Sequence, residues 1–294
     1  MRENDLISGL RGRIRDPDGV VGIGDDACVW TPGGPTTLST DTVVEGRHFR
    51  RDDDDTLVGG KAAGAALSDL AAMGALPKGA VVALTCPGHR SAEAVMDGCL
   101  EVLDRHACPL LGGDTTAGDH LVITVTVWGE AAHHRFLFRD GGSPGDLLVV
   151  TGPLGGSLNQ GRHLRVEPLL AEGAWFAGHP AVRAAMDLSD GLGADVRRLA
   201  AASGCGAMML PKQVPVHDDV PVISDTIRAA FDDGEDYELL VAVAPEHWPS
   251  IQLAWPFPRP LYVVGWLTDG SDILMEGPSG RVEPLPFRGY EHRA

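Results

Sequence analysis

Strand-like and helix-like segments alternate along the whole chain, and this alternation limits the possible folds more than any other feature. Residues 36–44 are rich in Thr and Val, as strands are, whereas residues 57–72 are Ala-rich and apolar on nearly every side, as buried helices are. Further strands are predicted at 80–85, 121–128, 147–150, 238–244 and 261–266, and further helices at 3–14, 91–106 and 192–202. A chain with both kinds of segment in both halves is expected to have an α/β or α+β fold.

A cluster of turn-forming residues divides the chain near its middle. The sequence Gly-Gly-Ser-Pro-Gly at 141–145 separates two stretches of strands and helices. A length of 294 residues suits two domains of medium size. We therefore expect one domain over residues 1–140 and a second over residues 141–294.

Charge, apolar stretches and cysteine spacing each exclude a class of partner or site. The chain carries 24 Lys and Arg against 41 Asp and Glu, a net charge of −17, whereas nucleic-acid binding needs clustered basic side chains. No apolar stretch is long enough to span a membrane, and the N-terminus lacks the apolar core of a signal peptide. The five cysteines include no C-x-x-C pair, which favours reduced thiols over disulfides or zinc. We expect a cytoplasmic protein that binds neither nucleic acid nor membranes.

Acidic residues recur in small, Gly-, Ser- or Thr-rich contexts beside apolar runs. Each acidic residue alone is typical of a helix cap or a turn, but its recurrence in six such segments favours a shared role. They contain Asp25, Asp26, Asp41, Asp69, Asp114, Asp187, Asp190, Glu235 and Asp236. Carboxylates that the fold brings together stay ionised only where cations neutralise them.

The residues of these segments point to a particular kind of chemistry. Carboxylate and hydroxyl oxygens suit Mg²⁺, which keeps several waters and is usually completed by substrate phosphates. Gly22 and Gly24 lie near Asp26, and two glycines directly precede Asp114, where they allow backbone N–H groups to approach a phosphate. The pattern favours metal-assisted phosphoryl transfer, which works by positioning and charge neutralisation and needs no nucleophilic side chain.

The order of these motifs resembles that of the thiamine-monophosphate kinase family. The matching segments are GIGDDACV, LSTDTVVEGRHF, ALSDLAAMGALP, LLGGDTTAG, MDLSDGLGAD and GEDYELL. The resemblance covers nearly the full chain, from about Val20 to Tyr290. The family shares its superfamily with aminoimidazole ribonucleotide synthetase, selenophosphate synthetase and a hydrogenase-maturation protein.

The resemblance implies a fold and a reaction. The fold is the two-domain fold of aminoimidazole ribonucleotide synthetase, in which the N-terminal sheet pairs across a homodimer and the second domain is α/β. The N-terminal domain would serve ATP and Mg²⁺ binding and dimerisation. The reaction is in-line transfer of the γ-phosphoryl group of ATP to thiamine monophosphate, which yields thiamine diphosphate.

The resemblance also implies roles for individual residues. Residues in contact with ATP would be Gly113, Asp114, Arg139 and Ser189. Residues on the thiamine-phosphate side would be His48, Glu235 and Phe287. Metal ligands would be Asp26, Ser39, Thr40, Asp41, Asp69, Asp114, Asp187 and Asp190. The resemblance assigns no side chain as a covalent or acid–base catalyst.

The chain departs from the family pattern on the acceptor side. Leu169 stands where the family usually has an Arg, and Phe287 stands where it has Trp. A Phe ring can still stack on a pyrimidine, with less area than Trp. Two alternatives follow: an ATP-dependent enzyme of the same superfamily with another small acceptor, or a non-catalytic nucleotide-binding relative.

Overall fold

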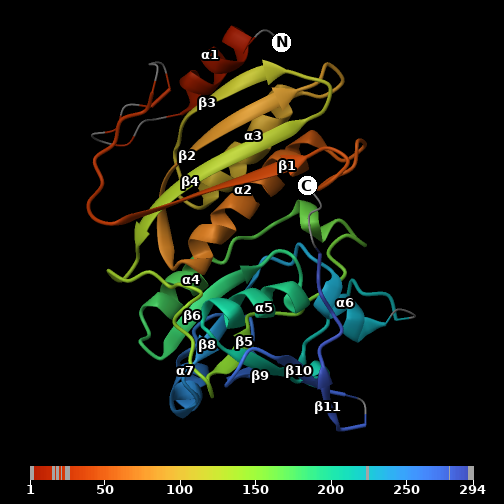
Figure 1. Ribbon diagram of the computed structural model, residues 1–294. Coiled ribbons are helices and arrows are strands. Elements are labelled where there is room, and N and C mark those ends of the chain that lie inside the picture. The colour runs from red at the N-terminus through yellow and green to blue at the C-terminus, as the bar shows by residue number, and fades with distance from the viewer. Residues whose placement is uncertain are drawn as a thin grey trace. The chain divides into compact units, whose positions relative to one another are not determined.

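The computed structural model describes residues 3–14, 17, 20, 22–23, 27–222, 225–277 and 279–290. The chain forms two compact units (Figure 1). Unit 1 comprises residues 1–70, 75–134 and 164–168, and unit 2 comprises residues 71–74, 135–163 and 169–294. No helix within the described ranges is both long enough and apolar enough to cross a membrane.

Unit 1 is a four-stranded sheet with helices on one face. Its elements in chain order are α1 (Glu3–Arg13), β1 (Thr36–Val44), α2 (Asp55–Ala72), β2 (Ala75–Cys86), α3 (Ala92–Arg105), β3 (Leu110–Ala117) and β4 (Val122–Ala131). The strand order is β1-β4-β2-β3, with β2 and β3 parallel and the other pairs antiparallel. β1 and β3 are therefore the two edges of this sheet.

The two faces of the sheet in unit 1 differ in burial. Val43, Val82, Leu84, Val125 and Val127 are buried on the face that α2 and α3 cover, which lies behind the strands in Figure 1. On the other face, which we call the open face, Leu38 is 63% exposed. The alternation along β1 and β4 places Thr40, Thr42, Thr124 and Thr126 on this face, at positions that a buried strand would fill with Val or Ile.

The helices α2 and α3 pack closely because both carry glycine where they meet. A Cβ atom on Gly98 of α3 would lie 1.8 Å from the Thr56 carbonyl oxygen of α2, and one on Gly59 would lie 1.9 Å from the Val95 oxygen. The Cys99 thiol donates to the Gly59 carbonyl at 3.2 Å. Ser91 caps the start of α3 by accepting from the Ala94 N–H.

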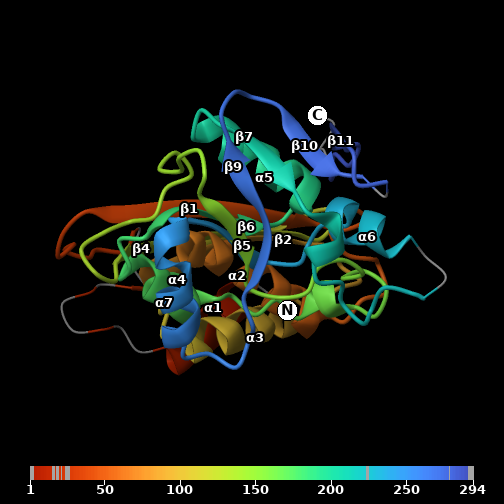
Figure 2. The ribbon, with the colours of Figure 1, turned by 90° about the horizontal axis from the view of Figure 1, so that it is seen from below.

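Unit 2 contains a seven-stranded mixed sheet. Its strands are β5 (Leu147–Val150), β6 (Val182–Leu188), β7 (Gly206–Met209), β8 (Glu238–Val243), β9 (Tyr262–Thr268), β10 (Ile273–Glu276) and β11 (Val282–Pro284). Their order is β11-β10-β7-β9-β5-β8-β6. In Figure 2, β10 and β11 lie to the right of β7 and β9. Its α-helices are α4 (Leu170–Ala177), α5 (Leu192–Ala202), α6 (Thr226–Asp232) and α7 (Trp248–Ala254). Short 3-10 helices lie at Arg162–Leu164, Pro211–Gln213 and Pro245–His247.

The core of unit 2 joins α5 to the strands of the sheet. Val196 and Leu199 of α5 pack with Met186 and Leu188 of β6 and with Phe231 of α6, all almost fully buried. The amphipathic pattern of α5 thus directs its apolar stripe onto the sheet. Because β6 leads directly into α5, the connection between them, Ser189–Gly191, is held at the end of the strand.

Most of the predicted elements lie where the sequence places them, with one instructive difference. The predicted strand at 80–85 is part of a longer strand, Ala75–Cys86, that includes Pro77. The pairing of β2 with β4 shifts register between Pro77 and Gly79, so the strand passes the proline through an irregularity. Gly74, with φ of +64°, ends α2 immediately before this strand.

Candidate active site

In unit 1, three predicted ligands lie on the helix-covered side of β1. Side chains alternate along a strand, so Ser39 and Asp41 point to the same side. The Ser39 hydroxyl donates to Asp69 Oδ2 on α2 at 2.5 Å, which brings strand and helix motifs together. One carboxylate oxygen of Asp41 accepts from the Thr42 N–H at 2.8 Å. Both Asp41 and Asp69 remain partly exposed.

Thr40 and Asp114 face the opposite side of the same sheet. Thr40 Oγ1 accepts from Thr126 Oγ1 at 3.0 Å across the β1–β4 pair. Asp114 lies in register with Ala83 of β2, which in turn lies opposite Thr124, so all three belong to the open face. Three strand spacings separate β1 from β3, a distance of about 14 Å. One chain therefore does not bring Asp41 and Asp114 to a common cation within this sheet.

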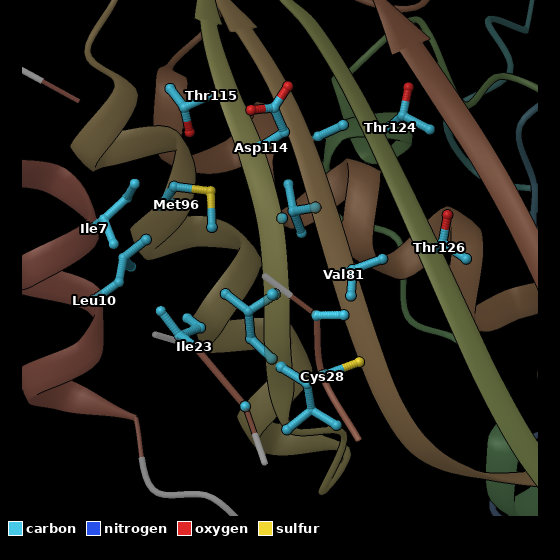
Figure 3. Close-up of a pocket in the computed structure, with 18 residues that line it drawn as sticks. Ile7, Leu10, Ile23, Cys28, Val81, Met96, Asp114, Thr115, Thr124 and Thr126 are labelled. Carbon is cyan, nitrogen blue, oxygen red and sulfur yellow. The ribbon is translucent and has the colours of Figure 1, made fainter. Parts of the chain in front are cut away.

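A pocket of about 560 Å³ lies beside β3 in unit 1 (Figure 3). Ile7 and Leu10 of α1 and Met96 of α3 form an apolar part of its wall, and Asp114 and Thr115 contribute polar groups. Gly112 and Gly113 also line it, so the β3 backbone is accessible there. The volume falls within the range of small-molecule sites.

His48 lies in a tight turn directly after β1. The ring Nδ1 accepts from the backbone N–H of Val44 at 3.0 Å, and the backbone N–H of His48 donates to the Val44 carbonyl at 3.0 Å. Because Nδ1 is an acceptor here, the neutral ring carries its hydrogen on Nε2. His48 can thus act as a hydrogen-bond donor through Nε2.

In unit 2, the predicted residues gather at the end of β6. The Glu235 N–H donates to the Ser189 carbonyl at 2.8 Å, and the Tyr237 N–H donates to the Leu188 carbonyl at 2.8 Å. Glu235 has φ of +67°, a conformation uncommon outside glycine. Asp187, one residue before the end of β6, is 4% exposed. The structure therefore places Ser189 and Glu235 beside each other.

Asp190 is held by two residues that the sequence motifs did not single out. Arg198 Nη1 donates to Asp190 Oδ2 and to Asp195 Oδ1, at 2.6 Å in each case. Asp195 Oδ2 accepts from the Asp190 N–H at 3.1 Å. Burial raises the pKa of Asp195 to about 6, against the effect of Arg198. Asp195 and Arg198 are three positions apart on α5, and this i,i+3 spacing of opposite charges is the sequence signal for the cluster.

Arg139 lies away from this group, whereas Phe287 lies close to it, since a Cβ atom on Gly193 at the start of α5 would be 3.0 Å from the Phe287 backbone. The Arg139 carbonyl accepts from Ser203 Oγ, so its backbone is at the C-terminal end of α5, whereas Asp190 precedes the N-terminal end. The length of α5 separates these ends by about 16 Å. The Phe287 ring stacks on Phe231 with centroids 5.0 Å apart. The following chain approaches Asp190, since the Tyr290 N–H donates to its carbonyl at 2.8 Å.

A buried carboxylate fixes a glycine loop beside Glu235. Both oxygens of Asp236 accept from the Gly155 N–H, at 2.9 and 3.1 Å, and Oδ1 accepts from Arg162 at 3.0 Å. Gly155 has φ of +87°, and a Cβ atom there would lie 2.8 Å from the backbone of Ala229. Burial raises the pKa of Asp236 to about 7, although the Gly155 N–H and Arg162 favour the charged form.

This raised pKa predicts a pH dependence of stability. An Asp in an unfolded chain titrates near about pH 3.9, so between about pH 4 and 7 the folded protein keeps a proton that the unfolded chain has lost. The contribution is fully present below pH 4 and falls as the pH rises to 7, by at most about 1.4 kcal/mol per pH unit. Asp236→Asn is expected to remove part of this slope in urea denaturation from pH 5 to 8, whereas Asp97→Asn on the surface retains it. Equal slopes for Asp236→Asn and the wild type would contradict the assignment.

The predicted ligands fit Mg²⁺ by their donor atoms. They offer carboxylate and hydroxyl oxygens, and the Ser39–Asp69 contact shows that such donors meet within unit 1. Over the ranges that the structure describes, no group of three or more His, Cys, Asp or Glu side chains could hold a metal ion. Asp26, a further predicted ligand, lies outside the described residues, as does Asp25.

Comparison with known proteins relates the whole chain to one enzyme family. Residues 24–131 match the family model described as AIR synthase related protein, N-terminal domain. The thiamine-monophosphate kinase of Rhodopirellula baltica is 36% identical over 313 aligned residues, which cover 99% of this chain and 97% of that protein. The thiamine-monophosphate kinase of Bacillus subtilis is 31% identical, with 99% of each chain covered.

Solved structures agree with this relationship. The crystal structure of thiamine-monophosphate kinase from Stenotrophomonas maltophilia superposes with a TM-score of 0.83 at 31% identity, covering 94% of this chain and 97% of that one. AaThiL complexed with AMPPCP and TMP superposes with a TM-score of 0.78 at 26% identity, covering 100% and 99%. Identity above 30% over nearly the full length of both chains shows that this chain belongs to the thiamine-monophosphate kinase family.

Proposed function

We propose that this protein transfers the γ-phosphoryl group of ATP to the phosphate of thiamine monophosphate, which gives thiamine diphosphate. The observation that carries this proposal is the match of 31–36% identity to thiamine-monophosphate kinases over 99% of the chain. AaThiL, whose structure holds AMPPCP and TMP, supports the same pair of substrates, because AMPPCP is an analogue of ATP.

We propose that the pocket beside β3 receives the nucleotide. Gly113 and Asp114, the residues expected at ATP, line this pocket together with the apolar side chains of Ile7, Leu10 and Met96. Apolar walls suit a purine base, and the accessible β3 backbone beside Gly112 and Gly113 suits polar groups of the ligand. Ser189 and Arg139 are the further residues that we assign to ATP.

The acceptor phosphate is assigned to His48 and Glu235, and the thiamine ring to Phe287. His48 Nε2 carries the donor hydrogen of the neutral ring, so it can bind a phosphate oxygen of the acceptor. Glu235 is held in an unusual backbone conformation, which costs of order 1–3 kcal/mol and occurs often at functional sites. These residues orient the acceptor oxygen for in-line attack; they do not form a covalent bond with it.

We assign Mg²⁺ to the carboxylates and hydroxyls of the motifs. The predicted ligands are Asp26, Ser39, Thr40, Asp41, Asp69, Asp114, Asp187 and Asp190. Bound Mg²⁺ would neutralise the phosphate charge that builds up during transfer. In the protein itself, the Ser39 hydroxyl orients Asp69, and Arg198 with Asp195 orients Asp190.

We also propose a homodimer formed through the sheet of unit 1. This sheet has two edge strands, β1 and β3, and an open face on which Leu38 is 63% exposed, and a second copy of the sheet would cover them. Asp41 and Asp114 lie on opposite faces and near opposite edges. A two-fold pairing of the sheets would allow Asp114 of one copy to serve the same nucleotide as Asp41 of the other.

Mixing two inactive variants tests this shared site. Asp41→Asn and Asp114→Asn homodimers are each expected to be inactive. After random reassortment, about half of the dimers contain one copy of each variant. If the two residues serve one site from different protomers, one of the two sites in such a dimer is intact. The mixture then regains about a quarter of wild-type activity. The measurement is thiamine diphosphate formation after subunit exchange, with unmixed variants as controls. A mixture that stays inactive despite proven exchange would contradict the shared site.

An acceptor panel tests the substrate itself. With labelled ATP, we expect label transfer to thiamine monophosphate in preference to other small phosphorylated or carboxylated acceptors. Preferred transfer to another acceptor would favour the second candidate, a related enzyme with a different substrate, which the Leu169 and Phe287 departures make worth testing. ATP binding without transfer would favour a non-catalytic relative. A cytoplasmic location is proposed because ATP is the co-substrate and all five cysteines are free thiols.

A further inference from the structure

Arg90, in the connection between β2 and α3, is buried against one distant segment of the chain. Its side chain is 5% exposed. Nη2 donates to the Arg50 carbonyl at 3.0 Å, and Nη1 donates to the Asp53 carbonyl at 2.6 Å and to Asp55 Oδ1 at 2.8 Å. All of these acceptors belong to residues 50–55, about 40 positions earlier in the sequence.

The same guanidinium also reaches the turn that carries His48. Nη2 lies 3.6 Å from Glu45 Oε1, at the start of this turn. The guanidinium carbon lies 5.6 Å from the centre of the Phe49 ring, at the end of the turn, within the range of a cation–π contact. Arg90 therefore contacts Glu45 before His48 and Phe49 after it.

The turn has other anchors besides Arg90, at its two ends. Glu45 Oε1 lies 3.3 Å from His89 Nε2, the Glu45 N–H donates to the Leu121 carbonyl at 2.9 Å, and the Phe49 side chain is buried. Within it, the Gly46 N–H donates to the Phe49 carbonyl at 2.8 Å, and His48 bonds to Val44 as described. These are local bonds, which define the shape of the turn but not its placement on the sheet. The Glu45 carboxylate supplies one anchor, since it accepts from the Leu121 N–H at 3.0 Å. Arg90 supplies a further anchor on the side of Phe49 and Arg50.

We propose that Arg90 is a positioning residue that sets the placement of His48, and through it the affinity for the acceptor phosphate. This proposal rests on the proposed function, in which His48 binds that phosphate. The planar guanidinium suits the task because its donors serve three acceptors in fixed directions, whereas an ammonium group is a single point charge. Glu45 and Asp55, with side chains 4% and 17% exposed, compensate its buried charge.

A double-mutant cycle separates positioning from a general structural role. The variants are Arg90→Met, His48→Ala and their combination, with Arg105→Met as control because its partners Glu101 and Glu167 lie on the surface. We expect Arg90→Met to raise the KM for thiamine monophosphate about tenfold, in proportion to one lost charged hydrogen bond, while the KM for ATP changes less than twofold. Arg105→Met is expected to change neither.

The combination of the two substitutions decides the mechanism. If Arg90 acts through His48, the double variant has the KM of His48→Ala alone, within about twofold. If the KM rises of the two single variants multiply in the double variant, Arg90 and His48 act independently and the proposal is overturned. An equal rise of the KM for thiamine monophosphate and the KM for ATP in Arg90→Met would also overturn it. Arg90→Lys keeps the charge and is expected to show a smaller rise, so the cycle can be repeated with it if Arg90→Met does not fold. Absence of any effect of His48→Ala would reject the phosphate role of His48, whereas absence of wild-type turnover would reject the proposed function itself.

Discussion

Replacing Asp41 by Asn is expected to reduce kcat/KM for thiamine diphosphate formation by roughly a thousandfold while the fold stays intact. The change removes one negative charge and preserves the size of the side chain. Loss of one metal-binding carboxylate removes several kcal/mol of transition-state stabilisation, and about 4 kcal/mol corresponds to a thousandfold in rate. Because Asp41 is partly exposed and its carboxylate accepts from the N–H of the next residue, Thr42, we expect little loss of stability.

Asp104→Asn provides a matched control for this experiment. It makes the same chemical change at an exposed position on α3. We expect wild-type turnover from this variant, and circular dichroism spectra of both variants that match the wild type. Normal Mg²⁺-dependent turnover by Asp41→Asn would show that the carboxylate is not a required ligand.

Replacing Gly98 by Ala is expected to lower the stability of unit 1 by about 3 kcal/mol, which corresponds to a fall in Tm of roughly 6–12 °C. The new methyl group would lie 1.8 Å from the Thr56 carbonyl oxygen and 2.9 Å from the Gly60 nitrogen, both backbone atoms of α2. Relief of this overlap requires α2 and α3 to separate. Asp69 is carried by α2, so we also expect a loss of activity.

Gly9→Ala is the control for this substitution. Gly9 is also a helical glycine, in α1, but nothing lies within 4 Å of the position that its Cβ would take. Alanine has the higher helix propensity, so this variant is expected to gain about 0.5 kcal/mol. Thermal denaturation followed by circular dichroism compares the two. Equal stability of Gly98→Ala and the wild type would contradict the close approach of α2 and α3.

Elements with a clear hydrophobic period could be predicted from the sequence. The strands at 36–44 and 147–150 and the helix at 192–202 have the same bounds in the structure as in the sequence prediction. Their signal is local: residues 36–44 are rich in Thr and Val, residues 147–150 form a short apolar run, and residues 192–202 carry an apolar stripe at helical spacing. β3 was missed as a strand because LLGGDTTA contains two glycines and polar residues, and its pairing with β2 supplies what its own sequence lacks.

The site was less predictable than the fold. The resemblance gave eight metal ligands as one set, and of these the structure brings Ser39 and Asp69 into contact. Spacing along the chain did not reveal that Thr40 and Asp114 face the other side of the sheet, because that depends on strand order and register. Arg90 and Arg198 also escaped prediction. The hydrogen bonds of Arg90 reach residues 35 to 40 positions away, and Arg198 lies beyond the end of the motif that contains Asp190.

Steady-state formation of thiamine diphosphate from thiamine monophosphate and ATP, with and without Mg²⁺, tests the central claim most directly. We predict turnover that requires Mg²⁺ and is lost when the cation is chelated. This result would establish the reaction and show that Leu169 and Phe287 are compatible with the acceptor. No thiamine diphosphate in the presence of Mg²⁺, from folded protein that binds ATP, would contradict the proposed reaction.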